Sequence, residues 1–270
     1  MHQRHHSQTH SLRQNLHTLF LGMLLLCLAL LGLYALHESL DARHQKQLAQ
    51  QMALSTEPAA PSPAPAQAPA PYVSPIDFAA LQAENPDAYA WVRLPGTQVD
   101  GPVLQHAQDT DYYLNHTLEG KAGLPGSIYT RNDTPQDFSG ACSVLYGHNM
   151  KNGTMFGTLK RFRDDAFFAD PDHRTIQIFT PEQELDYTIF AAVEYSDVLL
   201  THAFDLDTAE GKQAFLDSLQ AANGHFDAEI PVDAGEPLLV LSTCVGGGRN
   251  TVRYLVVGVL QHAAEQEKTL

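Results

Sequence analysis

The chain has 270 residues, with 16 Lys or Arg against 31 Asp or Glu, and its formal net charge at pH 7 is −15. Because binding to nucleic-acid phosphates needs clusters of basic side chains, this charge argues against a nucleic-acid partner. The chain has three cysteines, which is too few for a disulfide-stapled scaffold.

The N-terminal part of the chain is predicted to hold a domain near a membrane. Residues 19–36 contain no charged side chain, and their length approaches the roughly 20 residues that span a bilayer. No small-residue cleavage motif follows, so we expect an uncleaved signal anchor in the cell membrane. Residues 1–18 would lie in the cytoplasm, and residues 37–75 would form an extracellular spacer rich in proline and alanine.

One domain is predicted over residues 76–262, followed by a C-terminal tail at residues 263–270. The histidines near the N-terminus are irregularly spaced and no carboxylate accompanies them, so we read that segment as an ordinary polar tail. No metal site and no cofactor is expected.

The domain begins with short elements and continues as a series of strands. Apolar residues at 76, 78 and 81 predict a short helix that ends at Asn85-Pro86, and a short turn is predicted at 88–91. A longer helix is predicted over residues 208–222. Eight apolar runs are separated by turn residues: WVRLPG, GPVLQ, GSIYT, CSVLYG, TIQIFT, DYTIFAAVEY, PLLVLST and RYLVVGVLQ. This pattern predicts a mainly β fold, a closed eight-stranded barrel.

Three chemically versatile residues stand at predicted strand ends. Cys244 ends the seventh run and Arg253 begins the eighth, so an antiparallel pairing would place both at one rim of the sheet. His148 directly follows the fourth run. A thiol, an imidazole and a guanidinium together are typical of covalent acyl transfer. Cys142 lies six residues before His148, too far from that rim to bridge Cys244, and we expect it to be a core cysteine.

These motifs resemble those of the sortases, in particular class B. The resemblance runs from residue 76 to about residue 260 and is most specific in VLYGHNMKNGTMFGTLKRF and in LSTC followed by RYLVVG. It implies a sortase β-barrel with an N-terminal helical extension and a helix in the loop before the nucleophile strand. It also implies a membrane-anchored cysteine transpeptidase of a Gram-positive bacterium.

The resemblance assigns a role to each site residue. Cys244 matches the nucleophile, His148 the general acid and base, and Arg253 the third catalytic residue. The cysteine would attack the carbonyl after Thr in a sorting-signal pentapeptide, form a thioester, and pass the acyl group to a peptidoglycan cross-bridge amine. The positions that match substrate-binding residues are Ser242, Thr243, Leu114 and Thr110, the last standing where class B members often have Asn.

Several alternatives stay open at this stage. The acceptor amine could instead be a lysine of a pilin subunit. A cysteine endopeptidase is a further reading, although the local motifs of papain-like and caspase-like enzymes are absent. A non-catalytic surface-binding module is a third. Arg249 rivals Arg253 for the arginine role, and the sorting motif could be of the NPxTN, LPxTG or SPxTG type.

Overall fold

The computed structural model describes residues 72–233, 235–244 and 251–265, with six helical positions scattered before them. The chain divides into two compact units, Met1–Gln47 and Leu48–Leu270. The predicted anchor and spacer fall mostly outside the described residues, so their boundaries stay predictions. In the part of the chain that is described, no helix combines the length and the apolar character needed to cross a membrane.

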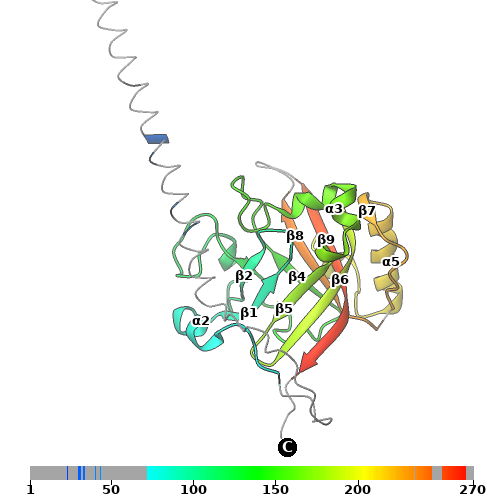
Figure 1. Ribbon diagram of the computed structural model, residues 1–270, viewed down its shortest axis with the longest axis horizontal. Coiled ribbons are helices and arrows are strands. Elements are labelled where there is room, and N and C mark those ends of the chain that lie inside the picture. The colour runs from blue at the N-terminus through cyan, green and yellow to red at the C-terminus, as the bar shows by residue number, and fades with distance from the viewer. Residues whose placement is uncertain are drawn as a thin grey trace, which may run out of the picture. The chain divides into compact units, whose positions relative to one another are not determined.

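The described strands of the second unit form one closed barrel (Figure 1). Their order is β5-β1-β2-β3-β4-β8-β9-β6, and a β5–β6 pairing closes the ring, while β7 adds to the free edge of β6. The strands are β1 (Ala88–Arg93), β2 (Asp100–Leu104), β3 (Ile128–Tyr129), β4 (Cys142–Tyr146), β5 (Thr175–Phe179), β6 (Gln183–Ser196), β7 (Asn223–Phe226), β8 (Leu238–Cys244) and β9 (Val252–Glu265). The predicted closed eight-stranded barrel is confirmed.

Alternation along the strands separates the barrel interior from its outer face. In β8, Leu239 and Leu241 join the interior cluster, whereas Leu238 and Val240 pack outward with the helical side of the domain. Successive side chains of a strand point to opposite faces, so a strand buried on both faces reads as a continuous apolar run. This burial explains why LLVL contains no polar residue.

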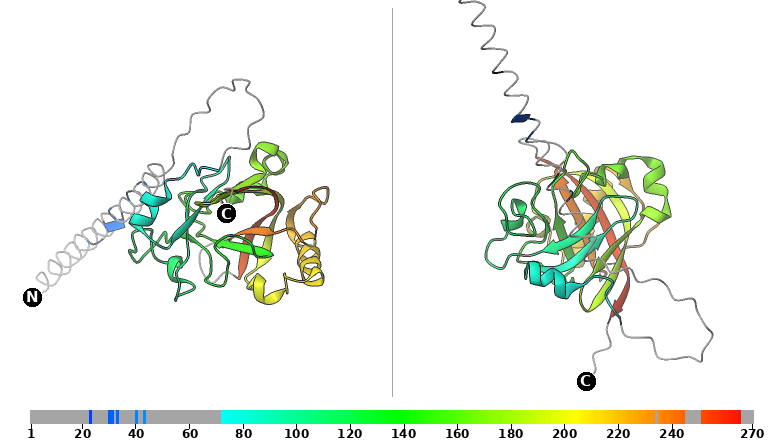
Figure 2. Two further views of the ribbon diagram at one scale, coloured as in Figure 1. Left: turned by 90° about the horizontal axis from the view of Figure 1, so that it is seen from below. Right: turned by 60° about the vertical axis from the view of Figure 1, so that its left-hand side comes forward.

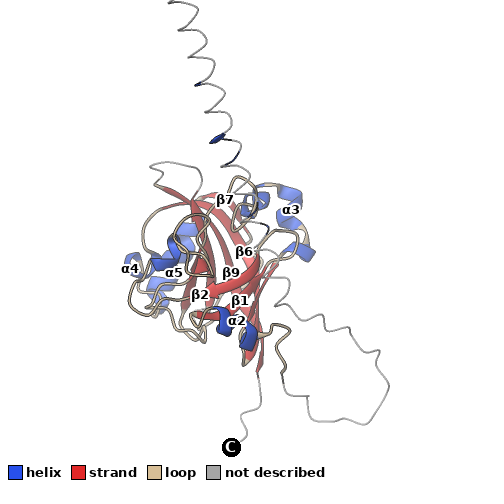
Figure 3. Ribbon diagram, turned by 90° about the vertical axis from the view of Figure 1, so that its left-hand side faces the viewer, coloured by secondary structure: helices blue, strands red, loops and turns tan. Residues whose placement is uncertain are grey.

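Helices cover the outside of the barrel rather than its centre (Figures 2 and 3). The described ones are α2 (Phe78–Glu84), α3 (Asp165–Ala169), α4 (Leu200–Ala203) and α5 (Ala209–Gln220), with 3₁₀ turns η1 (Tyr112–Leu114), η2 (Leu159–Arg163) and η3 (Pro171–His173). The prediction of a helix over 208–222 is confirmed by α5. Thr208 caps this helix by accepting a hydrogen bond from the Gly211 N–H. Two of its own side chains, Phe215 and Leu219, are fully buried.

Two local expectations were wrong. Residues 88–91 form the first part of β1, because β2 and β5 pair with this strand on its two edges and bury it. The strand β7 was not expected, because its sequence NGHF lacks an apolar run and its pairing with β6 alone makes it a strand. In both places a tertiary partner decides the local conformation.

Candidate active site

A groove of about 250 Å³ crosses the outer face of the barrel where β3, β4, β8 and β9 lie side by side. One boundary comes from η1 and the other from residues 196–200, which include the end of β6 and the segment after it. The predicted residues among its lining are Leu114, His148, Ser242, Thr243 and Arg253. The fold therefore gathers most of the predicted site residues in one concave place.

The end of β8 brings the cysteine position to the same place. Strands β8 and β9 are antiparallel, and Cys244 is the Cα partner of Arg253. The expectation that both positions share one rim is confirmed by this register. Arg253 is partly buried and lines the groove, whereas Arg249 lies outside the described residues.

His148 reaches the groove from the neighbouring strand. The parallel pairing of β4 with β8 places Tyr146 opposite Ser242, and the Gly147 N–H continues this ladder by donating to Ser242 O at 3.3 Å. The chain then turns, and His148 Nε2 lies 2.6 Å from the carbonyl oxygen of Leu114 in η1. The imidazole and the guanidinium thus line one groove although they lie 105 positions apart in the sequence.

Ser242 and Thr243 occupy different faces of β8. Ser242 lies two and four residues after the outward-facing Val240 and Leu238, so its side chain points to the same outer face, and it lines the groove. Thr243 is only 4% exposed, and its Oγ1 is buried without a hydrogen-bond partner among the described residues. Its register neighbour Tyr254 belongs to the interior cluster. Thr243 therefore contributes to the groove lining with its hydroxyl buried.

Thr110 is the predicted residue that the structure leaves outside the groove lining. Its Oγ1 donates to Asn132 Oδ1 at 2.8 Å and accepts from the Asn132 N–H at 3.2 Å. These bonds tie the segment before η1 to the segment after β3. Thr110 therefore supports the wall of the groove next to Asp111, which does line it.

Sequence reasoning missed a polar cluster in the groove. Arg131 Nη1 donates to Asp111 Oδ1 at 3.1 Å, and the Tyr129 hydroxyl donates to the same oxygen at 3.4 Å. Burial raises the pKa of Tyr146 to about 12, although the nearby Arg131 cation acts in the opposite direction. Asp111 directly follows Thr110 and Arg131 directly follows the apolar run GSIYT, but only the fold pairs these two charged residues.

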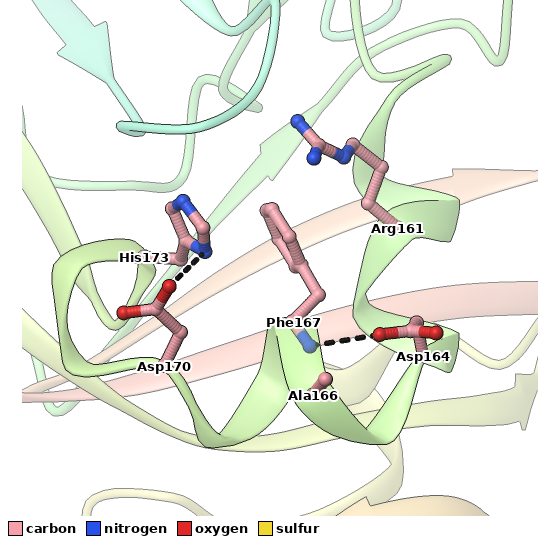
Figure 4. A pocket seen from close by; sticks show the side chains of 6 residues that line it. All are labelled: Arg161, Asp164, Ala166, Phe167, Asp170 and His173. Carbon is pink, nitrogen blue, oxygen red and sulfur yellow. Dashed lines mark hydrogen bonds and ion pairs between the residues drawn. The ribbon is translucent and has the colours of Figure 1, made fainter.

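A second, more open cavity of about 340 Å³ lies between η2, α3 and η3 (Figure 4). The Phe167 ring stacks on His173 at 4.1 Å, and the Arg161 guanidinium carbon lies 4.2 Å from the Phe167 ring centre. Arg161 also donates to the Gly96 carbonyl oxygen, and His173 Nδ1 lies 3.5 Å from Asp170 Oδ2. These groups bind one another and fasten the β1–β2 turn, so we interpret this cluster as structural.

The domain also has a free thiol away from the groove. Cys142 begins β4 and is the Cα partner of Leu238, six residues before Cys244 in β8. This register confirms that the two positions lie far apart along neighbouring strands. Among the described residues, no group of three or more His, Cys, Asp or Glu side chains is arranged to hold a metal ion.

Comparisons with known proteins agree with this architecture. A family model for the sortase domain matches residues 92–261. The chain is 29% identical over 167 residues to sortase B of Listeria monocytogenes, a match that covers 61% of this chain and 65% of that protein. The match therefore spans slightly less than two thirds of the relative's length.

Two solved structures share the fold. A class B sortase of Streptococcus pyogenes involved in pilus biogenesis is 30% identical, with a TM-score of 0.60 over 68% of this chain and 97% of that chain. A Staphylococcus aureus sortase B–substrate complex is 25% identical, with a TM-score of 0.62 over 70% of this chain and 86% of that chain.

Proposed function

This chain belongs to the sortase family, with class B members as its relatives, and from that membership we propose that it is a cysteine transpeptidase. It would cleave a sorting-signal pentapeptide after Thr and hold the acyl part as a thioester on Cys244. It would then transfer the acyl group to an amine of cell-wall peptidoglycan. The biological result is the anchoring of a secreted protein at the surface of a Gram-positive cell.

One observation carries this proposal: the register of β8 and β9 pairs Cys244 with Arg253 at a groove that also contains His148. Each residue alone has a simpler structural explanation. Acyl transfer to and from a thiol requires a cysteine, a cation and an imidazole close together. Here the cysteine stands at a strand end beside a groove that holds the other two.

The three side chains would supply different parts of the reaction. A free thiol is only about a few per cent thiolate at neutral pH, so Cys244 needs a base to become a nucleophile. His148 takes the thiol proton and later gives it to the leaving amide nitrogen. Arg253 stabilises the negative oxygen of the tetrahedral intermediate through charge and hydrogen bonds. Because the thioester retains the acyl energy, a new amide bond forms without a nucleotide.

The groove offers apolar surface to a bound peptide. Leu114 and Val198 are large apolar side chains that remain 45% and 46% exposed, and they line the groove from η1 and from the segment after β6. Their burial against a peptide would favour binding through the hydrophobic effect. Polar contacts are available from Ser242 and from the Asp111–Arg131 pair.

A protein lysine is the second candidate acceptor. The Streptococcus pyogenes relative, at 30% identity, is described as involved in pilus biogenesis, so a pilin polymerase is an alternative within the same chemistry. Both acceptors are primary amines that attack the same thioester. The proposal therefore commits to the acyl half of the reaction and leaves the two amines to experiment.

We place the enzyme at the cell membrane, with its catalytic domain outside. The support is the charge-free stretch at residues 19–36, with the proline-rich spacer after it. A spacer of this composition would hold the groove away from the lipid surface, where secreted substrates and cell-wall amines both pass.

The test uses the full-length chain and three peptide types, carrying NPxTN, LPxTG and SPxTG motifs. Each peptide is incubated with and without an oligoglycine or a diamino acid, and products are read by mass spectrometry. We expect cleavage after Thr, a peptide adduct on Cys244 and an amine-dependent ligated product. The Cys244→Ala variant should show none of these.

Other outcomes would point to the alternatives. Equal product with and without an amine would indicate a hydrolase. The absence of any adduct, together with a Cys244 thiol that does not react with a methanethiosulfonate, would indicate a binding module that keeps only the fold. A product with a pilin lysine peptide but none with cell-wall amines would identify the polymerase.

A further inference from the structure

The ring of His148 has a single hydrogen-bond partner among the described residues, and that partner is a backbone carbonyl. Nε2 lies 2.6 Å from Leu114 O. A carbonyl oxygen only accepts hydrogen bonds, so Nε2 must carry the proton. In the neutral imidazole the other nitrogen, Nδ1, is then unprotonated and able to accept a proton.

The carbonyl of Leu114 is held by a well-anchored turn. Within η1 the Leu114 N–H donates to Asp111 O at 3.0 Å, and the Ser127 N–H donates to Tyr113 O at 2.9 Å. The Tyr113 hydroxyl donates to Asp87 Oδ2 at 2.8 Å, which ties η1 to the start of β1. Because the turn is fixed on both sides, its carbonyl can orient a side chain in the way that a buried carboxylate does elsewhere.

A glycine makes the close packing behind this carbonyl possible. Gly126 has a φ of +66°, and a methyl group added to it would lie 2.5 Å from Leu114 O and 2.8 Å from Tyr113 O. Backbone atoms cannot yield at that distance as a flexible side chain can. A larger residue at 126 therefore presses on the two carbonyls of this turn, including the one that binds His148.

From these contacts we propose that η1 is the positioning element of the active site, and that it makes Nδ1 the working nitrogen of His148. The inference rests on the proposed function. Leu114 O holds the Nε2–H in both the neutral and the protonated ring. Nδ1 accepts the thiol proton as the Cys244 sulfur bonds to the peptide carbonyl carbon, and the same proton passes to the amine when the C–N bond breaks. Among the described residues no carboxylate is bonded to the His148 ring, so the carbonyl fills the orienting role.

The first measurement is made on the unaltered chain, with one variant used only to assign the signal. Long-range ¹H–¹⁵N spectra of the full-length chain at alkaline pH, where imidazoles are neutral, distinguish the two tautomers of each histidine. The His148 signal is assigned by its loss in His148→Gln. We expect the Nε2–H tautomer for His148. The Nδ1–H tautomer would overturn the proposal.

The second measurement displaces the carbonyl. In Gly126→Ala we expect a mixture of tautomers. We also expect kcat for the acylation of Cys244, measured with a peptide that the wild type cleaves, to fall about 10- to 100-fold, because misplacing a catalytic group by about 1 Å has effects of that size. Gly120→Ala is the matched control, since Gly120 has a φ of +72° and no atom within 4 Å of an added methyl group. It should keep the tautomer and stay within about threefold of wild-type activity. An unchanged tautomer in a folded Gly126→Ala variant would contradict the proposal.

A third variant separates the carbonyl from the side chain of the same residue. Leu114→Ala removes groove surface but keeps the backbone, so it should raise KM, retain the Nε2–H tautomer and leave kcat near wild type. Loss of the tautomer in Leu114→Ala would overturn the assignment to the carbonyl.

If wild type shows the expected tautomer but no peptide acylates Cys244, the proposed function and the role of Nδ1 fall together while the ring contact stands. If peptides are cleaved and the tautomer is Nδ1–H, only the positioning inference fails.

Discussion

Cys142 illustrates how the surroundings of a residue decide its chemistry. It packs against the apolar cluster beneath α5, near the buried Lys212 of that helix. The residue is partly exposed and packs against apolar neighbours, and desolvation of the thiol by burial is the main influence on its acidity. Burial raises the pKa of the Cys142 thiol to about 12, and the Lys212 cation offsets only part of the rise.

We predict that Cys142 does not react with thiol reagents in the folded protein. With a pKa of about 12, only about one thiol in ten thousand is ionised at pH 8. The measurement is methanethiosulfonate labelling of a Cys27→Ser/Cys244→Ala variant, which keeps Cys142 as the single thiol. Labelling should be absent at pH 8 and complete in denaturant. Rapid labelling of the folded variant would show that the thiol is open to solvent.

At the scale of elements, the turn between β1 and β2 depends on a ring from another part of the chain. Gly96 has a φ of +75°, and a methyl group there would overlap the His173 ring, 2.7 Å from its Nε2. The ring cannot swing away easily, because it stacks on Phe167 (Figure 4). The close approach of this turn to η3 therefore requires a glycine.

Gly96→Ala should lower the free energy of unfolding by roughly 2–4 kcal/mol, as the sum of left-handed backbone strain and overpacking. Urea denaturation measures the loss. In a His173→Ala background the overlap is removed, so the same substitution should cost about 1–2 kcal/mol, the backbone part alone. Equal losses in both backgrounds would show that His173 does not press on the turn.

The same scale shows how far local patterns reach. The apolar runs and the helix over 208–222 could be predicted because each is encoded in consecutive residues, and the β8–β9 pairing followed from two adjacent runs. By contrast, the contact of His148 with Leu114 joins residues 34 positions apart, and the Asp111–Arg131 pair spans 20 positions. Neither contact leaves a periodic signal, because η1 reaches the groove only when β2 and β3 pair in parallel. The placement of Cys244, His148 and Arg253 at strand ends was therefore predictable, whereas the contacts around them were not.

At the scale of the whole molecule, one ion pair joins segments that lie far apart in the chain. Arg174, between η3 and β5, donates from Nη2 to Asp227 Oδ2 at 2.9 Å and from Nε to Ile189 O in β6 at 2.7 Å. Its guanidinium carbon also lies 4.4 Å from the Phe168 ring centre in α3. Asp227 directly follows β7, so this pair fastens the edge strand and the 3₁₀ segment to the wall of the barrel.

The Arg174–Asp227 pair predicts part of the acid sensitivity of the fold. Burial acts to raise the pKa of Asp227, but hydrogen bonds from Arg174 and from the Glu229 N–H outweigh it and lower the pKa below 3.8. A carboxyl whose pKa is lower in the folded state stabilises that state above its unfolded pKa, and this stability is lost as the pH falls through the folded value.

Asp227→Asn should therefore lower the free energy of unfolding by about 1–3 kcal/mol at pH 7, since it leaves a largely buried guanidinium without its counter-charge. The gap between the two proteins should narrow steadily from pH 4 to pH 2, when chemical denaturation is repeated across that range. Glu182→Gln, at an exposed position in the β5–β6 turn, is the control and should stay within about 0.5 kcal/mol of wild type throughout. A gap that is the same at pH 2 as at pH 7 would mean that the Asp227 carboxylate charge does not stabilise the barrel, and that its packing alone does.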